Sequence, residues 1–168
     1  GSHQDAQEQF SSALEAFSAA VAFDGGELEE VYDRLNGQYE DSVAASEEVS
    51  ARIDKVESVA EALFDEWSEE LDKYENASLK RDSAAKLRET QRRYTSLMKA
   101  MRKAESKMPP VLNALQDNVL YLKHNLNASA IGALQGELST IENNVAQLIG
   151  QMNSAIAESD AFIASMKD

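Results

Sequence analysis

The feature that most constrains this chain is a heptad repeat of apolar residues running from Leu28 to Tyr74. Apolar or small residues recur there at alternating steps of four and three, with no proline and one interior glycine, Gly37. Such a repeat predicts a helix of about 70 Å whose apolar stripe is buried against other helices. Apolar residues also flank the seam, which favours a bundle of three or more helices over a two-stranded coil.

A second repeat follows after a short link. We expect a turn near Asn76-Ala77-Ser78, with Ser78 as the N-cap of the next helix. A link this short makes the two helices antiparallel neighbours. Pro109 and Pro110 predict a kink or a one-turn break at 107–110. The strict seven-residue spacing of the second repeat is carried by Leu87, Tyr94, Met101, Met108, Leu115 and Leu122.

The predicted fold class is all-α, an elongated antiparallel bundle of three long heptad-patterned helices plus a shorter N-terminal helix, of the spectrin-like or coiled-coil kind. Residues 4–168 are expected to form one domain. Gly1-Ser2-His3 resembles the remnant of a purification tag, so we expect native residues upstream to have been removed. The expected helices span about 4–23, 27–75, 79–125 and 128–167.

The first helix is expected to end at Asp24-Gly25-Gly26, because glycine supplies the left-handed cap and a flexible turn. The alternative is one continuous helix that the glycines merely kink. If the first helix folds back, it covers the same end of the bundle as the part of the chain that follows the proline kink. The sequence then predicts four helices at that end and three at the other.

The two long helices carry opposite charge. Residues 27–75 hold 17 acidic and 4 basic side chains, whereas residues 76–108 hold 10 basic and 3 acidic ones. A turn near residue 77 places Arg92 and Arg93 near Glu61 and Asp65. We expect a zipper of ion pairs that selects partner and register, since each exposed pair contributes only about 0–1 kcal/mol. The same pairing brings residues 47–54 close to the rest of the basic segment, Lys99, Arg102, Lys103 and Lys107.

Composition excludes several classes of site. The net charge of −14 disfavours nucleic acid and anionic membrane surfaces as partners. There is no cysteine, and no run of 18 apolar residues is present. The only native histidine, His124, suits a helix end and has no Glu-x-x-His pairing. The sequence therefore predicts no catalytic residue, no metal site and no cofactor.

Two alternatives remain open at this stage. The basic segment at 80–107 could instead bind nucleic acid, although the aromatic side chains that would stack on bases are missing there apart from Tyr94. Another possibility is a pocket for a small apolar ligand, lined by Trp67, Phe64, Tyr32, Tyr39 and Tyr74. We favour core packing for these aromatic residues, because they fall at helical seam spacing.

The last helix has an unusually neutral surface. Between residues 129 and 157 the only charged side chains are Glu137 and Glu142. Glycines off the seam let another backbone approach closely, so this face is a candidate for docking a protein partner or a second copy. The other candidate for the face is the first helix of the same chain. The proposed docking residues are Gly132, Gln135, Gly136, Asn143 and Gly150.

Several strings resemble a bacterial family of long-helix proteins of unknown function. They are FDGGELEEVYD at 23–33, VAEALFDEW at 59–67, RRY at 92–94 and LKHNLNA at 122–128. Some members carry the automatic label "DNA repair ATPase", and members often begin with a lipoprotein-type signal. The resemblance implies a periplasmic, envelope-associated protein that meets the membrane only through a lipid anchor outside this sequence. No phosphate-binding loop supports the ATPase label. We therefore expect a non-enzymatic structural or protein-interaction module.

Overall fold

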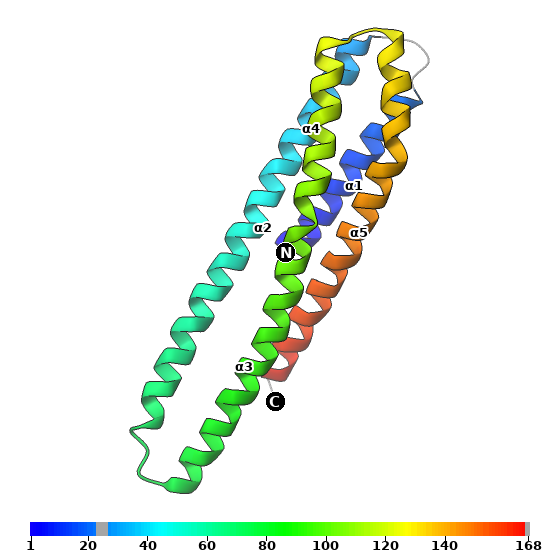
Figure 1. Cartoon of the computed structure of the whole chain (residues 1–168). Helices are drawn as coiled ribbons and strands as arrows, with labels where there is room; N and C mark the ends of the chain where they lie inside the picture. The colour runs from blue at the N-terminus through cyan, green and yellow to red at the C-terminus, as the bar shows by residue number, and fades with distance from the viewer. Residues whose placement is uncertain (23–26, 167–168) are drawn as a thin grey trace.

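The computed structural model describes residues 1–22 and 27–166, and these residues form helices without any strand. Figure 1 shows a long, narrow bundle in which α3 and α4 follow one another almost in line. The predicted all-α, elongated antiparallel bundle is confirmed. In chain order the elements are α1 (Ser2–Val21), α2 (Leu28–Leu71), α3 (Ala77–Ser106), α4 (Met108–His124) and α5 (Ala128–Met166).

The helix boundaries follow local chemistry. The expected break before the prolines occurs at Lys107, and Pro109 and Pro110 lie in the first turn of α4, where a missing N–H is tolerated. The prediction of Ser78 as an N-cap is wrong. Asn76 caps α3, because its backbone is extended and its Oδ1 accepts a 3.0 Å hydrogen bond from the Leu79 N–H.

The first helix and the second are separate elements that pack against each other. This rules out one continuous helix through residues 4–75. The stop predicted at Asp24-Gly25-Gly26 lies outside the described residues. The second helix ends at Leu71, which is earlier than the expected residue 75.

The number of helices around the core changes along the bundle. Both α1 and α4 pack against α2 and α5, while α3 also packs against α2 and α5. The end near α4 therefore has four helices, as expected from the sequence. Beyond the start of α1, the end of α5 accompanies α2 and α3, and the hairpin of α2 and α3 then extends past α5 (Figure 1). The expected three helices at this end are therefore wrong for its tip, which α2 and α3 alone among the described helices reach. We refer below to the four-helix half and the three-helix half.

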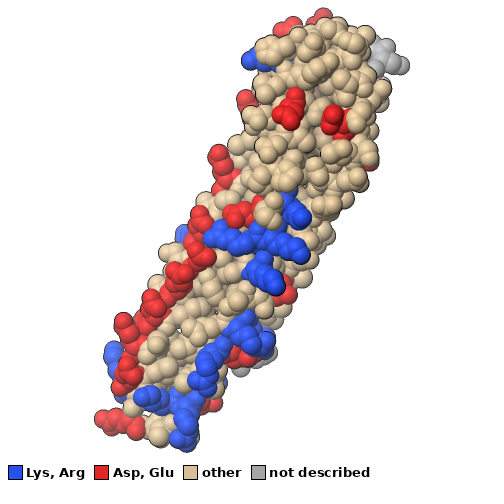
Figure 2. All heavy atoms as spheres, in the orientation of Figure 1, with Lys and Arg blue, Asp and Glu red and all other residues tan. Residues whose placement is uncertain are grey.

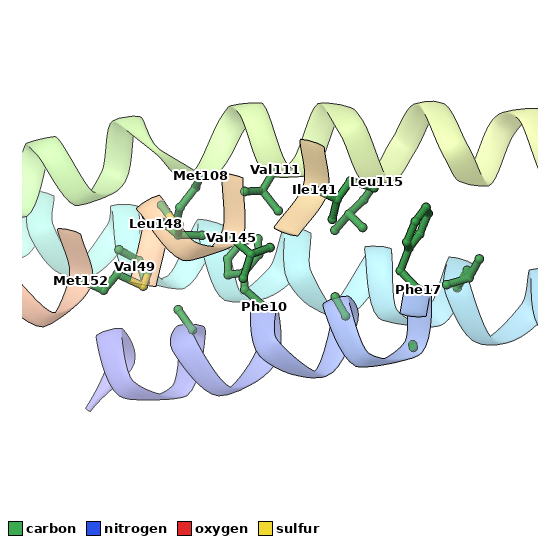
Figure 3. Close-up of a cluster of buried hydrophobic side chains, with 14 of the residues drawn as sticks. Phe10, Phe17, Val49, Met108, Val111, Leu115, Ile141, Val145, Leu148 and Met152 are labelled. Atoms are coloured by element: carbon green, nitrogen blue, oxygen red, sulfur yellow. The ribbon is translucent and has the colours of Figure 1, made fainter. Parts of the chain in front are cut away.

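The largest buried side chains gather in the four-helix half. Phe10 and Phe17 of α1 are 0% and 1% exposed, and they lie among aliphatic residues of α2, α4 and α5 (Figure 3). Burying a side chain of this size contributes about 1.5–3 kcal/mol. The other labelled members of this cluster are Val49, Met108, Val111, Leu115, Ile141, Val145, Leu148 and Met152.

One polar layer fixes how α1 sits on α2. Ser42, on the apolar seam of α2, is completely buried. The Nε2 of Gln9 donates to the Oγ of Ser42 at 3.3 Å and to the Oε1 of Gln38 at 3.0 Å. Sliding α1 by a turn would leave these groups buried without partners, which is costly. The layer therefore helps to specify the register of the two helices.

Candidate functional site

The basic segment lies along α3, beside the acidic ridge of α2 (Figure 2). The predicted contacts of Arg92 and Arg93 with Glu61 and Asp65 are wrong. Both arginines instead bind Glu89 of their own helix, at 2.6 and 3.0 Å. Residues three and four positions apart are neighbours on a helix surface, so Glu89 is within easier reach than the next helix. The hydrogen bond from Arg92 lowers the pKa of Glu89.

Arg102 is the basic residue that bridges the two helices. Its guanidinium donates to Asp54 of α2 at 3.0 Å and to Glu105 of α3 at 3.1 Å, and it lies 3.5 Å from Glu57. Partial burial would lower the pKa of Arg102, but the hydrogen bonds from its guanidinium to Asp54 and Glu105 outweigh burial and raise it. The predicted zipper is thus present at Arg102.

The other three cations of the segment take no part in that zipper. Among the described residues Lys99, Lys103 and Lys107 form no ion pair within 4 Å. Lys99 and Lys103 are exposed, and Lys107 is half-buried at the junction of α3 and α4. Arg92 and Arg93 of the same segment border a hollow together with Glu158 of α5, and the three lysines do not line it.

The neutral face of α5 is open. Gly132, Gly136 and Gly150 are exposed, and a Cβ added at any of them would meet nothing within 4 Å. The glycines therefore do not seat α1 against α5, which removes close packing of the first helix as their explanation. Gln135 does contact α1, because its Nε2 donates to the carbonyl of Val21 at 2.8 Å. Asn143 is exposed.

Phe64 and Tyr94 line the apolar groove described below, whereas Trp67, Tyr32, Tyr39 and Tyr74 do not. Tyr32 and Tyr39 pack against the core of the four-helix half, as expected. In the three-helix half the Nε1 of Trp67 donates to the Oγ of Ser83 at 2.8 Å and ties α2 to α3. Tyr74 is 41% exposed, so the expectation that it belongs to the core is wrong. It follows Leu71, where α2 ends and nothing covers the seam.

An apolar groove of about 330 Å³ lies in the three-helix half. Its walls come from α2 and α5, and Tyr94 and Leu97 of α3 line it as well. The ring of Phe64 packs edge to face against the ring of Tyr94, with 5.3 Å between the ring centroids. The groove is lined by Arg52, Lys55, Val56, Val59, Ala60, Leu63, Phe64, Thr90, Tyr94, Leu97, Phe162 and Met166.

The groove continues the line of α1. The first turn of α1 borders a smaller hollow, which shares Arg52 and Val56 with the groove. Figure 1 shows that the N-terminus lies about midway along α2. Beyond that point Val59 is 59% exposed and Leu63 is 45% exposed, although both continue the apolar stripe of α2. The groove is therefore the position that a fourth helix occupies in the other half.

The electrostatics of the groove suit a neutral, apolar occupant along its base. Burial, reinforced by the carboxylates of Glu57 and Glu61, raises the pKa of the Tyr94 hydroxyl. Tyr94 is therefore uncharged at neutral pH. The charged residues that line the groove, Arg52 and Lys55, both belong to α2. The arrangement can bind an amphipathic helix, and no pair of groups in it is placed for acid–base chemistry.

The sequence analysis did not identify this groove as a site. Part of the signal was available in the sequence, because Val59 and Leu63 continue the apolar pattern of α2 beyond Ile53. Which helices lie beside these residues follows only from the packed structure.

Metal-binding clusters and membrane-spanning helices are absent from residues 1–22 and 27–166. No group of three or more His, Cys, Asp or Glu side chains there is arranged to hold a metal ion. His124 is the last residue of α4, next to Lys123, as predicted. Within the described helices, none has a stretch long and apolar enough to cross a membrane.

Comparison with known proteins identifies the family. The model of the family described as "Protein of unknown function (DUF2959)" matches residues 1–166, so the chain belongs to this family. The match agrees with the resemblance to a family of unknown function. It does not bear on the ATPase label or on the lipoprotein-type signal. No curated protein and no solved structure matches the chain.

Proposed function

We propose that this member of the DUF2959 family is a non-enzymatic structural and protein-interaction module. The observation that carries the proposal is the apolar groove lined by α2, α3 and α5. Exposed apolar side chains that continue a buried seam mark surfaces that bind other proteins. A helix in the groove would bury Val59, Leu63 and Met166 in the same way that α1 buries the equivalent stripe in the other half.

Site-directed photo-cross-linking in native cells tests this function. A benzophenone side chain at position 59 places the reactive group in the groove. The same group at Asn113, an exposed residue of α4, is the matched control. We expect protein adducts from position 59 that position 113 does not give, identified by mass spectrometry. No adduct from position 59 would contradict the proposal.

The neutral face of α5 is a second candidate docking surface. It rests on the exposure of Gly132, Gly136, Gly150, Gln135 and Asn143 and on the open space beside the glycines. A benzophenone at position 132 gives the comparison with position 59. Adducts from position 132 alone would move the docking surface from the groove to α5.

The absence of catalysis is part of the proposal. The groove holds no nucleophile paired with a base, and the family description names no activity. A turnover that persists through purification and is abolished by one point substitution would overturn this.

An envelope location is proposed on the sequence resemblance alone. Fractionation of native cells tests it, with recovery expected in the envelope or periplasmic fraction. Recovery of the protein only with cytoplasmic markers would refute it.

A further inference from the structure

The exposed stripe of α2 along the groove carries an ordered pattern of charge. Six residues at helical spacing fall within about 80° of one another around the helix axis. Basic residues come first, apolar residues follow, and acidic residues come last. We define the α2 stripe as Arg52, Lys55, Val59, Leu63, Glu66 and Glu70.

The members of the stripe are exposed and available. Among the described residues, its four charged side chains make no ion pair within the chain, whereas Asp54 and Glu57 on another face of α2 lie beside Arg102. Arg52, Lys55, Val59 and Leu63 also line the groove. The stripe thus has both unpaired charge and uncovered apolar surface in one line.

We infer that the groove is filled by α2 of a second copy of this chain, in an antiparallel pair related by a two-fold axis. The inference rests on the proposed function and names its partner. A two-fold axis placed between Val59 and Leu63 brings Val59 of one copy against Leu63 of the other. The same axis brings Arg52 opposite Glu70 and Lys55 beside Glu66.

Charge selects this orientation. A two-fold axis generates each contact twice, so the antiparallel pair has four ion pairs flanking an apolar centre. A parallel pair in register would place Arg52 against Arg52 and Glu70 against Glu70, which is repulsive. Arrangements of basic, apolar and acidic residues along one helix face are self-complementary only when the two helices run in opposite directions.

The groove adds surface beyond the helix–helix contact. A partner helix lying on Val59 and Leu63 also contacts the α5 wall, where Phe162 is half-buried and Met166 is 51% exposed. Ile163, next to that wall on α5, is likewise exposed. The second copy therefore covers apolar residues of both α2 and α5.

Charge reversal tests the inference directly. One variant carries Arg52→Glu and Lys55→Glu, and the other carries Glu66→Lys and Glu70→Lys. Sedimentation velocity over a range of concentrations should show a dimer for the unchanged 168-residue protein. Each variant alone should dimerise roughly tenfold or more weakly, because like charges then face each other across the axis.

The decisive experiment mixes the two variants in equal amounts. The α2 stripe of the first variant is acidic at both ends, and that of the second variant is basic at both ends. The mixture should therefore form a heterodimer as tightly as the unchanged protein forms its dimer. Circular dichroism confirms that each variant is folded. The combined variant with all four reversals should also recover dimerisation, since the pattern is inverted but remains complementary.

Each other outcome overturns the inference. A protein that is monomeric at all accessible concentrations has no such pair, and a dimer indifferent to both reversals uses another surface. If the protein is a monomer and position 59 still cross-links to a different protein, the proposed interaction function stands and the second copy as occupant of the groove is refuted. If the protein is a monomer and position 59 gives no cross-link, both the proposed function and this inference are refuted.

Discussion

The two halves of the bundle share α2 and α5 but differ in what covers them. In the four-helix half, α1 lies on the seam of α2, and Val49 is 0% exposed. In the three-helix half no described helix lies on that position, and Val59 on the same helix is 59% exposed. The apolar residues are of the same kind in both places. The comparison shows that packing against α1, and not the type of residue in α2, decides which part of this apolar stripe is buried in the described residues.

The largest contrast between the halves should appear on truncating one apolar side chain in each. Phe10→Ala empties a fully buried site and should lower the free energy of unfolding by about 3–5 kcal/mol. Leu63→Ala, in the groove, should lower it by less than about 1 kcal/mol. Chemical denaturation at concentrations that keep the chain monomeric measures both. Equal losses would mean that the groove is already covered.

The hydrogen bond that ties the tip of the three-helix half is the next target. Ser83→Ala removes the acceptor of the Trp67 Nε1–H and should cost about 0.5–1.5 kcal/mol. Trp67 is the single tryptophan, so its fluorescence reports on this half alone. Ser96→Ala, at an exposed position on the same helix, is the control and should have no measurable effect. If the emission maximum of Trp67 is the same before and after Ser83→Ala, that result would argue against the hydrogen bond.

Replacing a glycine by alanine on the open face of α5 should raise the free energy of unfolding, whereas the substitutions above lower it. Gly136→Ala should stabilise the protein by about 0.5–1 kcal/mol, since the added Cβ meets nothing and alanine favours the helix. Gly37→Ala on α2 is the matched comparison, because its Cβ also meets nothing. Thermal unfolding measures both. A destabilised Gly136→Ala would show that this face is packed against something in solution.

The smallest expected effect concerns the ion pairs between α2 and α3. Arg102→Gln removes the bridge to Asp54 and should cost about 0–1 kcal/mol, because the arginine is partly exposed and the aspartate is mostly exposed. Lys99→Gln, at a residue without an ion pair, should cost nothing measurable. Urea denaturation at low and high salt measures the free energy of unfolding of both variants. Only the loss caused by Arg102→Gln should become smaller as the salt concentration rises. A loss that salt does not change would point to packing of the arginine stem.

Much of the fold could be predicted because heptad spacing reports directly on buried helix faces. The long helices, the break before Pro109 and the unequal number of helices at the two ends all follow from that spacing. Local competition decided the details that were missed. Asn76 caps α3 because its backbone is extended, whereas Ser78 already lies inside the helix. Glu89 binds Arg92 because it lies one turn away on the same helix, nearer than Glu61 of α2.

The candidate site was harder to predict. The sequence analysis placed docking on the glycines of α5, and the structure leaves that prediction untested. The groove depends on how α3 and α5 lie beside α2, and a heptad pattern gives no such alignment. The change from basic to acidic residues along the α2 stripe was visible in the sequence. Its meaning depends on knowing that Arg52 and Lys55 share an exposed face with Val59, which requires the packed structure.

Hydrogen–deuterium exchange at two protein concentrations tests the central claim most directly. If a second copy fills the groove, amides of residues 52–70 and the end of α5 should exchange more slowly at high concentration. Amides around Phe10 and Val111, in the four-helix half, should be indifferent to concentration because that half is already complete. Exchange that does not depend on concentration anywhere, or that slows only in the four-helix half, would contradict the account.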